Sequence, residues 1–364
     1  MEITEFLRVI VEKEASDGHI KAGSSPVVRT PNGGLEILHG FPVFSAEDTE
    51  RIAYSIMRPL QKEQFEKTSE LDISYACDSI GRFRINIYRQ KGNVGLAIRR
   101  TRARIPSYTE LNLPAQMRQI ALSERGIVLL AGITGSGKST TLACMIENIN
   151  KEKARHIITI EDPIEFVFED KKSIINQREI DIDTASFHSA LKHAVRQDPD
   201  VIAIGEIRDP ETFQASISAS ETGHLVFSTI HSTDCTQAIS RILEFFLPPR
   251  QPQIRLQLSY HIRAIICQRL LKKADGRGLI PAVEMLIGTP TVSHLIRENK
   301  IEKIYSAIQT GIADGMQTLN QSLVKLVQAK LVTLEEALIQ SENPDGLKMN
   351  LKGIYLDEER KIIG

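Results

Sequence analysis

A glycine-rich segment carries the clearest sign of chemistry in this sequence. Residues 132–140, Gly-Ile-Thr-Gly-Ser-Gly-Lys-Ser-Thr, fit the phosphate-binding pattern G-x-x-x-x-G-K-[ST]. In this pattern backbone N–H groups face the phosphates of a nucleoside triphosphate, Lys138 adds a positive charge near the β- and γ-phosphates, and the hydroxyl of Ser139 is a ligand of Mg²⁺. The predicted nucleotide-binding residues are Thr134, Gly135, Ser136, Gly137, Lys138, Ser139 and Thr140.

The neighbours of this segment decide its interpretation, because a glycine-rich turn without a ligand could show the same residues. Residues 127–131 form a short, unbroken apolar run, which is typical of a buried parallel strand. Residues 140–146 continue in a pattern that fits a helix. The segment therefore links a strand to a helix, where the glycines allow a close approach of the backbone and the helix dipole favours phosphate. We expect the chain to bind ATP with Mg²⁺.

Polar residues follow three further apolar runs along the chain. Glu165 comes after the first run, Glu206 after the second and His231 after the third. Hydrolysis of a phosphoanhydride needs one carboxylate to activate water, a second to anchor Mg²⁺, and a donor near the γ-phosphate. A single glutamate at the end of a strand is usually a solvated loop residue, but the occurrence of such groups on successive strands favours an active site.

The spacing of the same runs predicts the fold of the larger part of the chain. Residues 156–160, 201–205 and 224–229 are apolar, and helix-length segments separate them. This alternation indicates an α/β fold with a doubly wound, mostly parallel sheet. Ligands in such sheets bind at the carboxyl ends of the strands, where the polar residues above are found.

The first hundred residues follow a different pattern. Short β-rich segments, including the alternating run at residues 82–89, indicate a half-exposed antiparallel sheet in a small α+β domain. Prolines near residues 106 and 114 are typical of a connecting segment. We therefore predict an N-terminal domain over residues 1–105, a linker over residues 106–118, and an ATPase domain with a C-terminal helical region over residues 119–364.

Composition restricts the remaining classes of function. The 364 residues carry a formal net charge of −1, so the chain has no overall basic field for nucleic acid. The four cysteines are scattered and form no C-x-x-C pair, which argues against a structural zinc site and a disulfide framework. The amino terminus lacks a signal-peptide pattern, and no run approaches the roughly 18 apolar residues of a membrane span. We expect a cytoplasmic protein that does not bind nucleic acid.

Several motifs together resemble one family over nearly the whole chain. Residues 15–19, Ala-Ser-Asp-Gly-His, resemble an amino-terminal A-S-D-x-H signature, in which Gly18 stands where the family commonly has an apolar residue. The Walker A loop is followed by segments that match an aspartate box (158–165), an atypical Walker B segment with glutamate (196–209), a histidine box (221–231) and two carboxy-terminal segments (288–298 and 315–319). The chain thus resembles the PilT/PilU-type ATPases of the type IV pilus and type II secretion superfamily.

This resemblance implies a RecA-like P-loop ATPase with a PAS-like N-terminal domain, and it implies roles for particular residues. Glu165 matches the general base for the attacking water, and Glu206 matches the Walker B glutamate near Mg²⁺. His224 and His231 match the pair of histidines that senses the γ-phosphate. Arginines of the N-terminal sheet reach toward phosphate in the family, and the candidates here are Arg82, Arg84 and Arg99, with Arg89, Arg100, Arg102 and Arg104 close by in the sequence.

The resemblance also implies a biological setting. The family works as a homo-hexameric ring whose ATP hydrolysis powers type IV pilus retraction and disassembly, the basis of twitching motility. The implied partners are an inner-membrane platform protein of the pilus machine and a second pilus ATPase. Such contacts would hold the protein peripherally at the inner membrane.

Alternative functions stay open at this point. The chain lacks the tetracysteine segment and the longer amino-terminal region usual in extension-type relatives, which favours retraction over pilus assembly or type II secretion. Residues 288–293 nevertheless depart from the alanine-isoleucine-arginine string of the retraction motors, so neither the direction nor the choice between the PilT and PilU branches is fixed. A nucleic-acid translocase and a non-catalytic ATP-binding ring subunit are further alternatives, against which the net charge and the intact Walker and glutamate motifs weigh.

Overall fold

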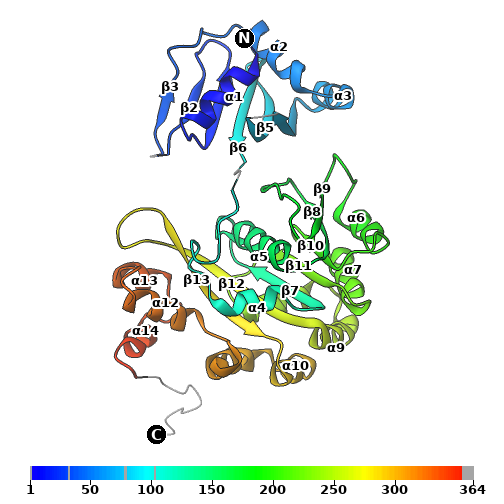
Figure 1. The fold of residues 1–364 in the computed structure, drawn as a ribbon, viewed down its shortest axis with the longest axis vertical. Coiled ribbons are helices and arrows are strands. Elements are labelled where there is room, and N and C mark those ends of the chain that lie inside the picture. Colours follow the sequence, from blue (N-terminus) through cyan, green and yellow to red (C-terminus); the bar gives the residue numbers. More distant parts are fainter. Residues whose placement is uncertain (1, 32, 78–79, 102–103, 355–364) are drawn as a thin grey trace. The chain divides into compact units, whose positions relative to one another are not determined.

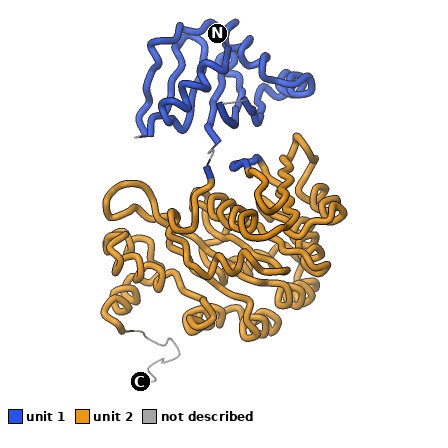
Figure 2. Tube along the Cα trace, viewed as in Figure 1, with its two compact units in different colours: residues 1–104, 163–167 blue, residues 105–162, 168–364 orange. Residues whose placement is uncertain are grey.

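The computed structural model describes residues 2–31, 33–77, 80–101 and 104–354. Its chain separates into two compact units (Figure 2). Unit 1 comprises Met1–Arg104 together with the segment Pro163–Val167, and unit 2 comprises Ile105–Asp162 and Phe168–Gly364. The phosphate-binding loop lies in unit 2, whereas the candidate arginines lie in unit 1.

Unit 1 is an antiparallel sheet with helices packed on its apolar face. The sheet has the strand order β3-β2-β1-β6-β5-β4. Its strands are β1 (Asp17–Lys21), β2 (Val27–Arg29), β3 (Leu35–Ile37), β4 (Glu70–Cys77), β5 (Gly81–Gln90) and β6 (Asn93–Arg100), and its helices are α1 (Ile3–Glu12), α2 (Ala46–Ile56) and α3 (Pro59–Thr68). Alternation along β5 buries Phe83, Ile85 and Ile87 in one core with the helices. The predicted α+β unit with a half-exposed antiparallel sheet is confirmed.

The glycine in the amino-terminal signature has a packing reason. Gly18 lies in β1 directly beneath α1, and a Cβ atom built on it would come within 2.5 Å of Ile10 Cδ1 and 2.8 Å of Phe6 Cζ. Both neighbours are fully buried, so they have little room to move. An apolar side chain at position 18 therefore cannot be accommodated without displacing α1.

Unit 2 is built around a seven-stranded sheet with the order β13-β12-β7-β11-β10-β8-β9 (Figure 1). Six neighbouring strands run parallel, and only β13 is antiparallel to its partner β12. The strands are β7 (Gly126–Ala131), β8 (His156–Glu161), β9 (Ile174–Glu179), β10 (Val201–Ile204), β11 (Leu225–Ile230), β12 (Ile262–Lys272) and β13 (Leu279–Ile287). The predicted α/β class and the four predicted strands are confirmed, and β9, β12 and β13 are additional.

Helices cover both faces of this sheet, which makes it doubly wound. Helices α4 (Ala115–Ala121) and α5 (Lys138–Glu152) contribute Met117 and Met145 to the core of one face. The core of the other face contains residues of α6 to α11, as well as of the central strands. The bounds of those helices are α6 (Phe187–Ala194), α7 (Pro210–Glu221), α8 (Cys235–Glu244), α9 (Gln251–His261), α10 (Pro290–Arg297) and α11 (Ile304–Thr310).

A third group of helices packs against the β12–β13 hairpin. These are α12 (Leu319–Gln328), α13 (Leu334–Gln340) and α14 (Pro344–Leu351). Leu323 and Leu347 of this group share a small core with Leu271 and Ile280 of the hairpin. The hairpin is therefore supported along its outer part by the C-terminal helices, as Figure 1 shows.

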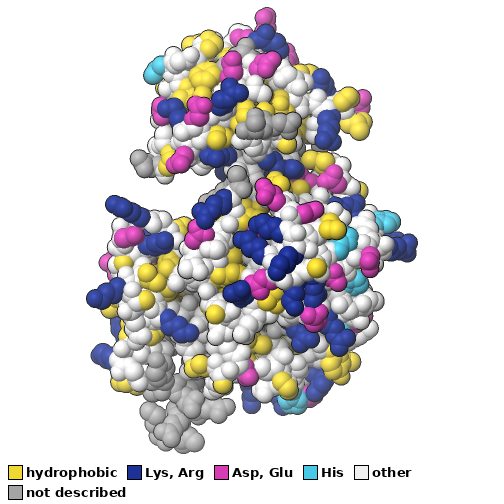
Figure 3. Space-filling model, in the orientation of Figure 1, with side chains coloured by type: hydrophobic (Ala, Val, Ile, Leu, Met, Phe, Trp, Pro, Cys, Tyr) yellow, Lys and Arg dark blue, Asp and Glu magenta, His cyan; other side chains and the backbone are white. Residues whose placement is uncertain are grey.

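Two surface properties bear on function. Among the described residues, no helix is long and apolar enough to cross a membrane. Positive and negative side chains are mixed over the face drawn in Figure 3, without a single sign dominating either unit. The mixture of signs on this face agrees with the nearly balanced charge of the sequence.

Candidate active site

The phosphate-binding loop joins β7 to α5, as its pattern requires, and glycines set its shape. Gly132, Gly135 and Gly137 have φ angles of 148°, 80° and 87°, in the region that side chains disfavour. A Cβ atom on Gly132 would lie 2.4 Å from Ser136 Oγ, so the loop also closes too tightly for a side chain there. These angles turn the backbone into the N-terminus of α5, a helix of 15 residues whose free N–H groups and dipole favour an anion.

The side chain of Lys138, which is expected to bind phosphate, lies inside the loop. Its Nζ donates hydrogen bonds to the carbonyl oxygens of Gly132 at 2.8 Å and Ile133 at 3.0 Å. Its side chain is 8 % exposed, so the ammonium is largely buried at the centre of the loop. Ser136 Oγ is buried close by without a hydrogen-bond partner among the described residues. An unpaired buried hydroxyl beside a buried ammonium fits a site that takes a phosphate oxygen.

Parallel register brings two of the predicted residues to the same edge of the sheet. Ile204 at the end of β10 pairs with Ser228, and Ile230 at the end of β11 pairs with Ala131, the last residue before the loop. Glu206 and His231 follow these strand ends directly, and His231 Nε2 lies 3.1 Å from Glu206 Oε1. The structure therefore brings these two predicted residues together at the carboxyl edge of the sheet.

The guanidinium of Arg208 also holds Glu206. Arg208 Nε donates a 2.7 Å hydrogen bond to Glu206 Oε2, and one of its Nη atoms lies at the same distance. The backbone on either side of Glu206 is fixed to β11, since Thr229 Oγ1 donates to Gly205 O at 2.7 Å and Ile207 N donates to Thr229 O at 3.0 Å. The carboxylate, 14 % exposed, is thus positioned by its own strand and by its neighbour.

Glu165 and the loop are carried by different units. Glu165 is exposed in the segment Pro163–Val167, which belongs to unit 1, whereas Lys138 belongs to unit 2. A carboxylate within unit 2 is Glu161, the last residue of β8, which accepts hydrogen bonds from Thr159 Oγ1 at 2.6 Å and Gln177 Nε2 at 3.0 Å. Glu161 lies at the carboxyl edge, where its position directly after the predicted strand at residues 156–160 points to it.

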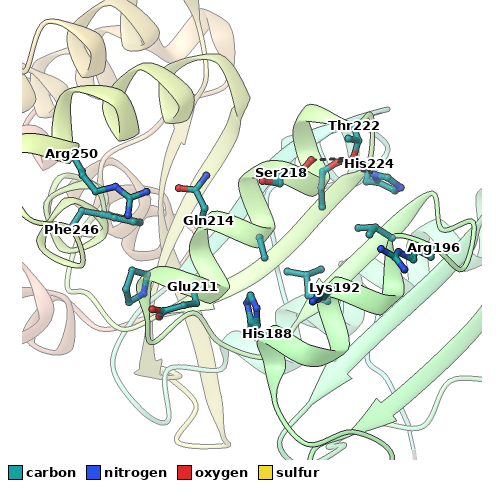
Figure 4. A pocket seen from close by; sticks show the side chains of 15 residues that line it. His188, Lys192, Arg196, Glu211, Gln214, Ser218, Thr222, His224, Phe246 and Arg250 are labelled. Carbon is teal, nitrogen blue, oxygen red and sulfur yellow. Dashed lines mark hydrogen bonds between the residues drawn. The ribbon is translucent and has the colours of Figure 1, made fainter.

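His224 is not brought to this edge of the sheet. It precedes β11, so the six residues of that strand separate it from His231 by roughly 20 Å. Its Nδ1 lies 2.8 Å from Ala219 O and 3.1 Å from Thr222 Oγ1. Its ring faces a groove of about 720 Å³ between α6 and α7 (Figure 4). Two residues that bracket one strand necessarily lie at opposite edges of a sheet, so within this chain only His231 lies at the edge that carries the loop. The sensing role implied for His224 stays a prediction.

The three candidate arginines share the exposed face of the unit 1 sheet. Arg84 and Arg99 are direct cross-strand partners on β5 and β6, and Arg82 lies two residues before Arg84 on the same face. Each has a polar neighbour on the sheet. Arg82 Nε donates to Ser74 Oγ at 2.8 Å, Arg84 Nε is 3.8 Å from Asp72 Oδ1, and Arg99 Nε donates to Asp17 Oδ1 at 2.8 Å.

The pairing of Arg99 changes the chemistry of its partner. Burial alone would raise the pKa of Asp17, but hydrogen bonds from Arg99 and Ser16 outweigh it and hold that pKa below the ordinary value. Among the alternatives named from the sequence, Arg89 lies 5.3 Å from the Phe65 ring and Arg102 falls outside the described residues. The triad of Arg82, Arg84 and Arg99 therefore forms a compact positive group on one sheet face.

Comparison with known proteins agrees with this arrangement. Residues 105–278 match the family model described as "Type II/IV secretion system protein". The chain is 41 % identical to the "Type IV pilus retractation ATPase PilT" of Pseudomonas aeruginosa over 95 % of this chain and 99 % of that protein. The chain belongs to the PilT/PilU family of secretion ATPases. It is also 38 % identical to "Type IV pilus ATPase PilU" of the same organism, over 97 % of this chain and 92 % of the relative.

A solved structure extends the likeness to three dimensions. The structure described as "Crystal Structure of the Pilus Retraction Motor PilT and Bound ADP" matches with a TM-score of 0.89 and 44 % sequence identity, covering 96 % of this chain and 99 % of that one. The RecA-like fold and the ATPase class expected from the sequence are confirmed. Binding of a nucleotide by this PilT/PilU-family chain follows as well.

The donor set around the loop fits Mg²⁺ held with phosphate better than a metal in a protein cage. Among the residues that the structure describes, no cluster of three or more histidine, cysteine, aspartate or glutamate side chains could hold a metal ion. Mg²⁺ commonly keeps several waters and binds through one or two protein oxygens plus substrate phosphates. Two suitable oxygens of this kind are the hydroxyl of Ser139, at the start of α5, and the carboxylate of Glu206, just after the end of β10.

One residue at the loop was not found from the sequence. Gln268 of β12 is 2 % exposed, and its Nε2 donates a 2.7 Å hydrogen bond to Ser136 O within the loop. Its Oε1 accepts a 2.8 Å hydrogen bond from Thr141 Oγ1 on α5. More than a hundred residues separate Gln268 from the loop, and no local pattern marks it.

Proposed function

We propose that this chain is an ATP-driven motor that powers the retraction and disassembly of a type IV pilus, and hence twitching motility. The observation that carries the proposal is the likeness to PilT over 99 % of that protein's length, with the phosphate loop and the Glu206–His231 pair in place. We further propose that the protein works in the cytoplasm as a homo-hexameric ring on an inner-membrane platform protein, beside a second pilus ATPase.

The chemistry proposed for unit 2 follows from the geometry of its loop. Lys138 and the N–H groups of the loop bind the β- and γ-phosphates, and Ser139 supplies a hydroxyl ligand to Mg²⁺. Bound Mg²⁺ would neutralise charge on the phosphate oxygens. Glu206, whose two oxygens are already positioned by Arg208 and His231, would be the carboxylate that anchors Mg²⁺ beside Ser139.

Two further roles are proposed for unit 1. Glu165 orients and deprotonates the attacking water, and Arg82, Arg84 and Arg99 supply positive charge to the phosphates. Glu165 and the arginines all belong to unit 1, while the phosphate loop belongs to unit 2. Catalysis that needs both units would make hydrolysis depend on their movement, which is how a motor couples chemistry to mechanical work.

Deletion of the gene in the source organism tests the proposed direction. We expect abundant surface pili without twitching in the deletion strain, and rescue by the wild-type gene but not by Lys138→Ala. Counting pili by electron microscopy and scoring surface motility gives both readouts from the same cultures. Loss of the pili themselves would indicate assembly and overturn the proposal.

A further inference from the structure

The hairpin formed by β12 and β13 extends past the end of the strand that carries the phosphate loop. Cys267 of β12 pairs with Ala131, the last residue of β7. Strand β12 continues to Lys272, and residues 268–272 pair only with β13. This part of the hairpin runs beside the loop, where a Cβ atom on Gly132 would lie 2.7 Å from Gln268 O and one on Gly137 would lie 2.7 Å from Gln268 Nε2.

The side chain of Gln268 makes the contact specific. A backbone carbonyl can only accept a hydrogen bond, so Ser136 O requires the amide nitrogen of Gln268, and the amide oxygen then faces Thr141 Oγ1. Both bonds are buried, and both the NH₂ and the C=O of the side-chain amide are used. One glutamine thus ties the middle of the loop to the first turn of α5, on which the lysine and the hydroxyl for Mg²⁺ are found.

The hairpin is itself firmly anchored on its other side. Strand alternation turns Arg269 away from Gln268, and Arg269 donates to Gln340 O at 2.8 Å and to Thr233 O at 3.2 Å. Arg269 also forms an ion pair with Glu342 beyond α13. Gln268 is therefore mounted on a strand that the C-terminal helices hold in place.

We propose that Gln268 is a positioning residue for nucleotide binding: its amide fixes the curvature of the phosphate loop so that the loop N–H groups converge on phosphate. The inference deepens the ATPase function and rests on it. The loop holds the phosphates both before and during phosphoryl transfer, so loss of the amide weakens the binding of the substrate and of the transition state about equally. The consequence is a higher KM for ATP and a higher Kd for ADP, with little change in kcat.

Gln268→Met in the full-length protein is the direct test, because methionine has a similar length and cannot replace either hydrogen bond. We expect the Kd for ADP and the KM for ATP to rise about tenfold, and kcat to stay within about threefold of wild type. Gln268→Glu removes the donor to Ser136 O and adds a negative charge near the phosphates, so its Kd for ADP should rise at least as much.

Gln317→Met is the matched control. Gln317 is also buried in unit 2, where its Nε2 donates to Val283 O at 2.9 Å and its Oε1 accepts from Lys325 Nζ at 2.7 Å. Its replacement likewise removes one hydrogen bond donated to a backbone carbonyl and one accepted from a side chain, here the Lys325 ammonium, and does so away from the loop. We expect a lower melting temperature and an ADP affinity within twofold of wild type. A general loss of stability lowers the active fraction without changing KM, so the two variants separate positioning from folding.

A weaker variant guards against a Gln268→Met protein that does not fold. Thr141→Val removes only the partner of Gln268 Oε1 and should raise the Kd for ADP about threefold, while Thr141→Ser should leave it unchanged. Unchanged ADP affinity in a folded Gln268→Met protein, or in Thr141→Val when the former does not fold, would overturn the proposal. An equal loss in Gln317→Met would do the same. Failure of the wild-type protein to bind ADP would instead refute the ATPase function on which the proposal rests.

Discussion

Replacement of Gly132 by alanine should abolish most nucleotide binding, for two structural reasons. The φ angle of 148° is unfavourable for any side chain and costs about 1–2 kcal/mol. The added Cβ would also lie 2.4 Å from Ser136 Oγ, which can rotate away, and 2.7 Å from Gln268 O, which belongs to the backbone of β12 and cannot move alone. We expect these two effects together to cost about 3 kcal/mol or more of nucleotide-binding free energy, because the loop must deform. This corresponds to a loss of about 100-fold or more in affinity for ADP.

Calorimetric titration of ADP into Gly132→Ala at 25 °C measures this loss, and a melting curve checks the fold. The control is Gly276→Ala, in the turn of the β12–β13 hairpin. Its φ angle is 72°, and nothing lies within 4 Å of a Cβ atom built there. This control should lower the melting temperature by about 2–4 °C and leave ADP affinity unchanged. An ADP affinity of Gly132→Ala within threefold of wild type would refute the claim that the loop packs too tightly against β12 to hold a side chain at position 132.

Three further predictions concern other parts of the chain. Glu165→Gln should reduce steady-state phosphate release about 100-fold or more while ADP affinity stays within threefold, and normal turnover would remove Glu165 as the base. Because the pKa of Asp17 is lowered in the folded state, its carboxylate stabilises unit 1 at pH values above the ordinary pKa of 3.8, and this stabilisation is lost as the pH falls through the lower folded-state pKa. Arg99→Gln should raise the pKa of Asp17 in a carboxyl NMR titration. An unchanged pKa would show that Arg99 does not cause the shift. Burial raises the pKa of Cys267 to about 12, so at pH 8 iodoacetamide should label the partly exposed Cys77 first, and equal labelling rates by mass spectrometry would contradict the packing.

The nucleotide site could be predicted from the sequence where its residues are contiguous. The loop at residues 132–140 is a local pattern, and the apolar run before it identified β7. Glu206 and His231 could also be placed, because parallel strands bring their carboxyl ends to one edge. The same rule places His224 at the opposite edge, since it stands at the amino end of β11.

The contacts made by the C-terminal hairpin could not be predicted in the same way. Helix α9 ends at His261 and β12 begins at Ile262, with no glycine or proline between them to mark the change. The register that sets Gln268 beside Ser136, which lies 132 residues earlier, depends on the pairing of β12 with β7. Sequence periodicity specifies faces of elements, but it does not specify which distant strand becomes the neighbour.

The unit to which Glu165 belongs was also not predicted from the sequence. The expected domain boundaries assigned Glu165 to the ATPase domain, whereas its segment, Pro163–Val167, groups with unit 1. A short excursion from one unit to the other leaves no compositional signal, because it contains the same apolar residues that a buried loop would contain. Ile164 and Phe166 are buried in this segment while Glu165 is exposed between them.

Direct observation of pilus retraction tests the central claim most closely. Fluorescently labelled pili would be filmed on cells that lack the chromosomal gene and carry either the wild-type gene or Glu165→Gln, at matched protein levels. We predict that pili extend in both strains, and that they retract at the normal rate only with the wild-type gene. Normal retraction with Glu165→Gln, or in cells without the gene, would contradict the account of this chain as the ATP-hydrolysing retraction motor.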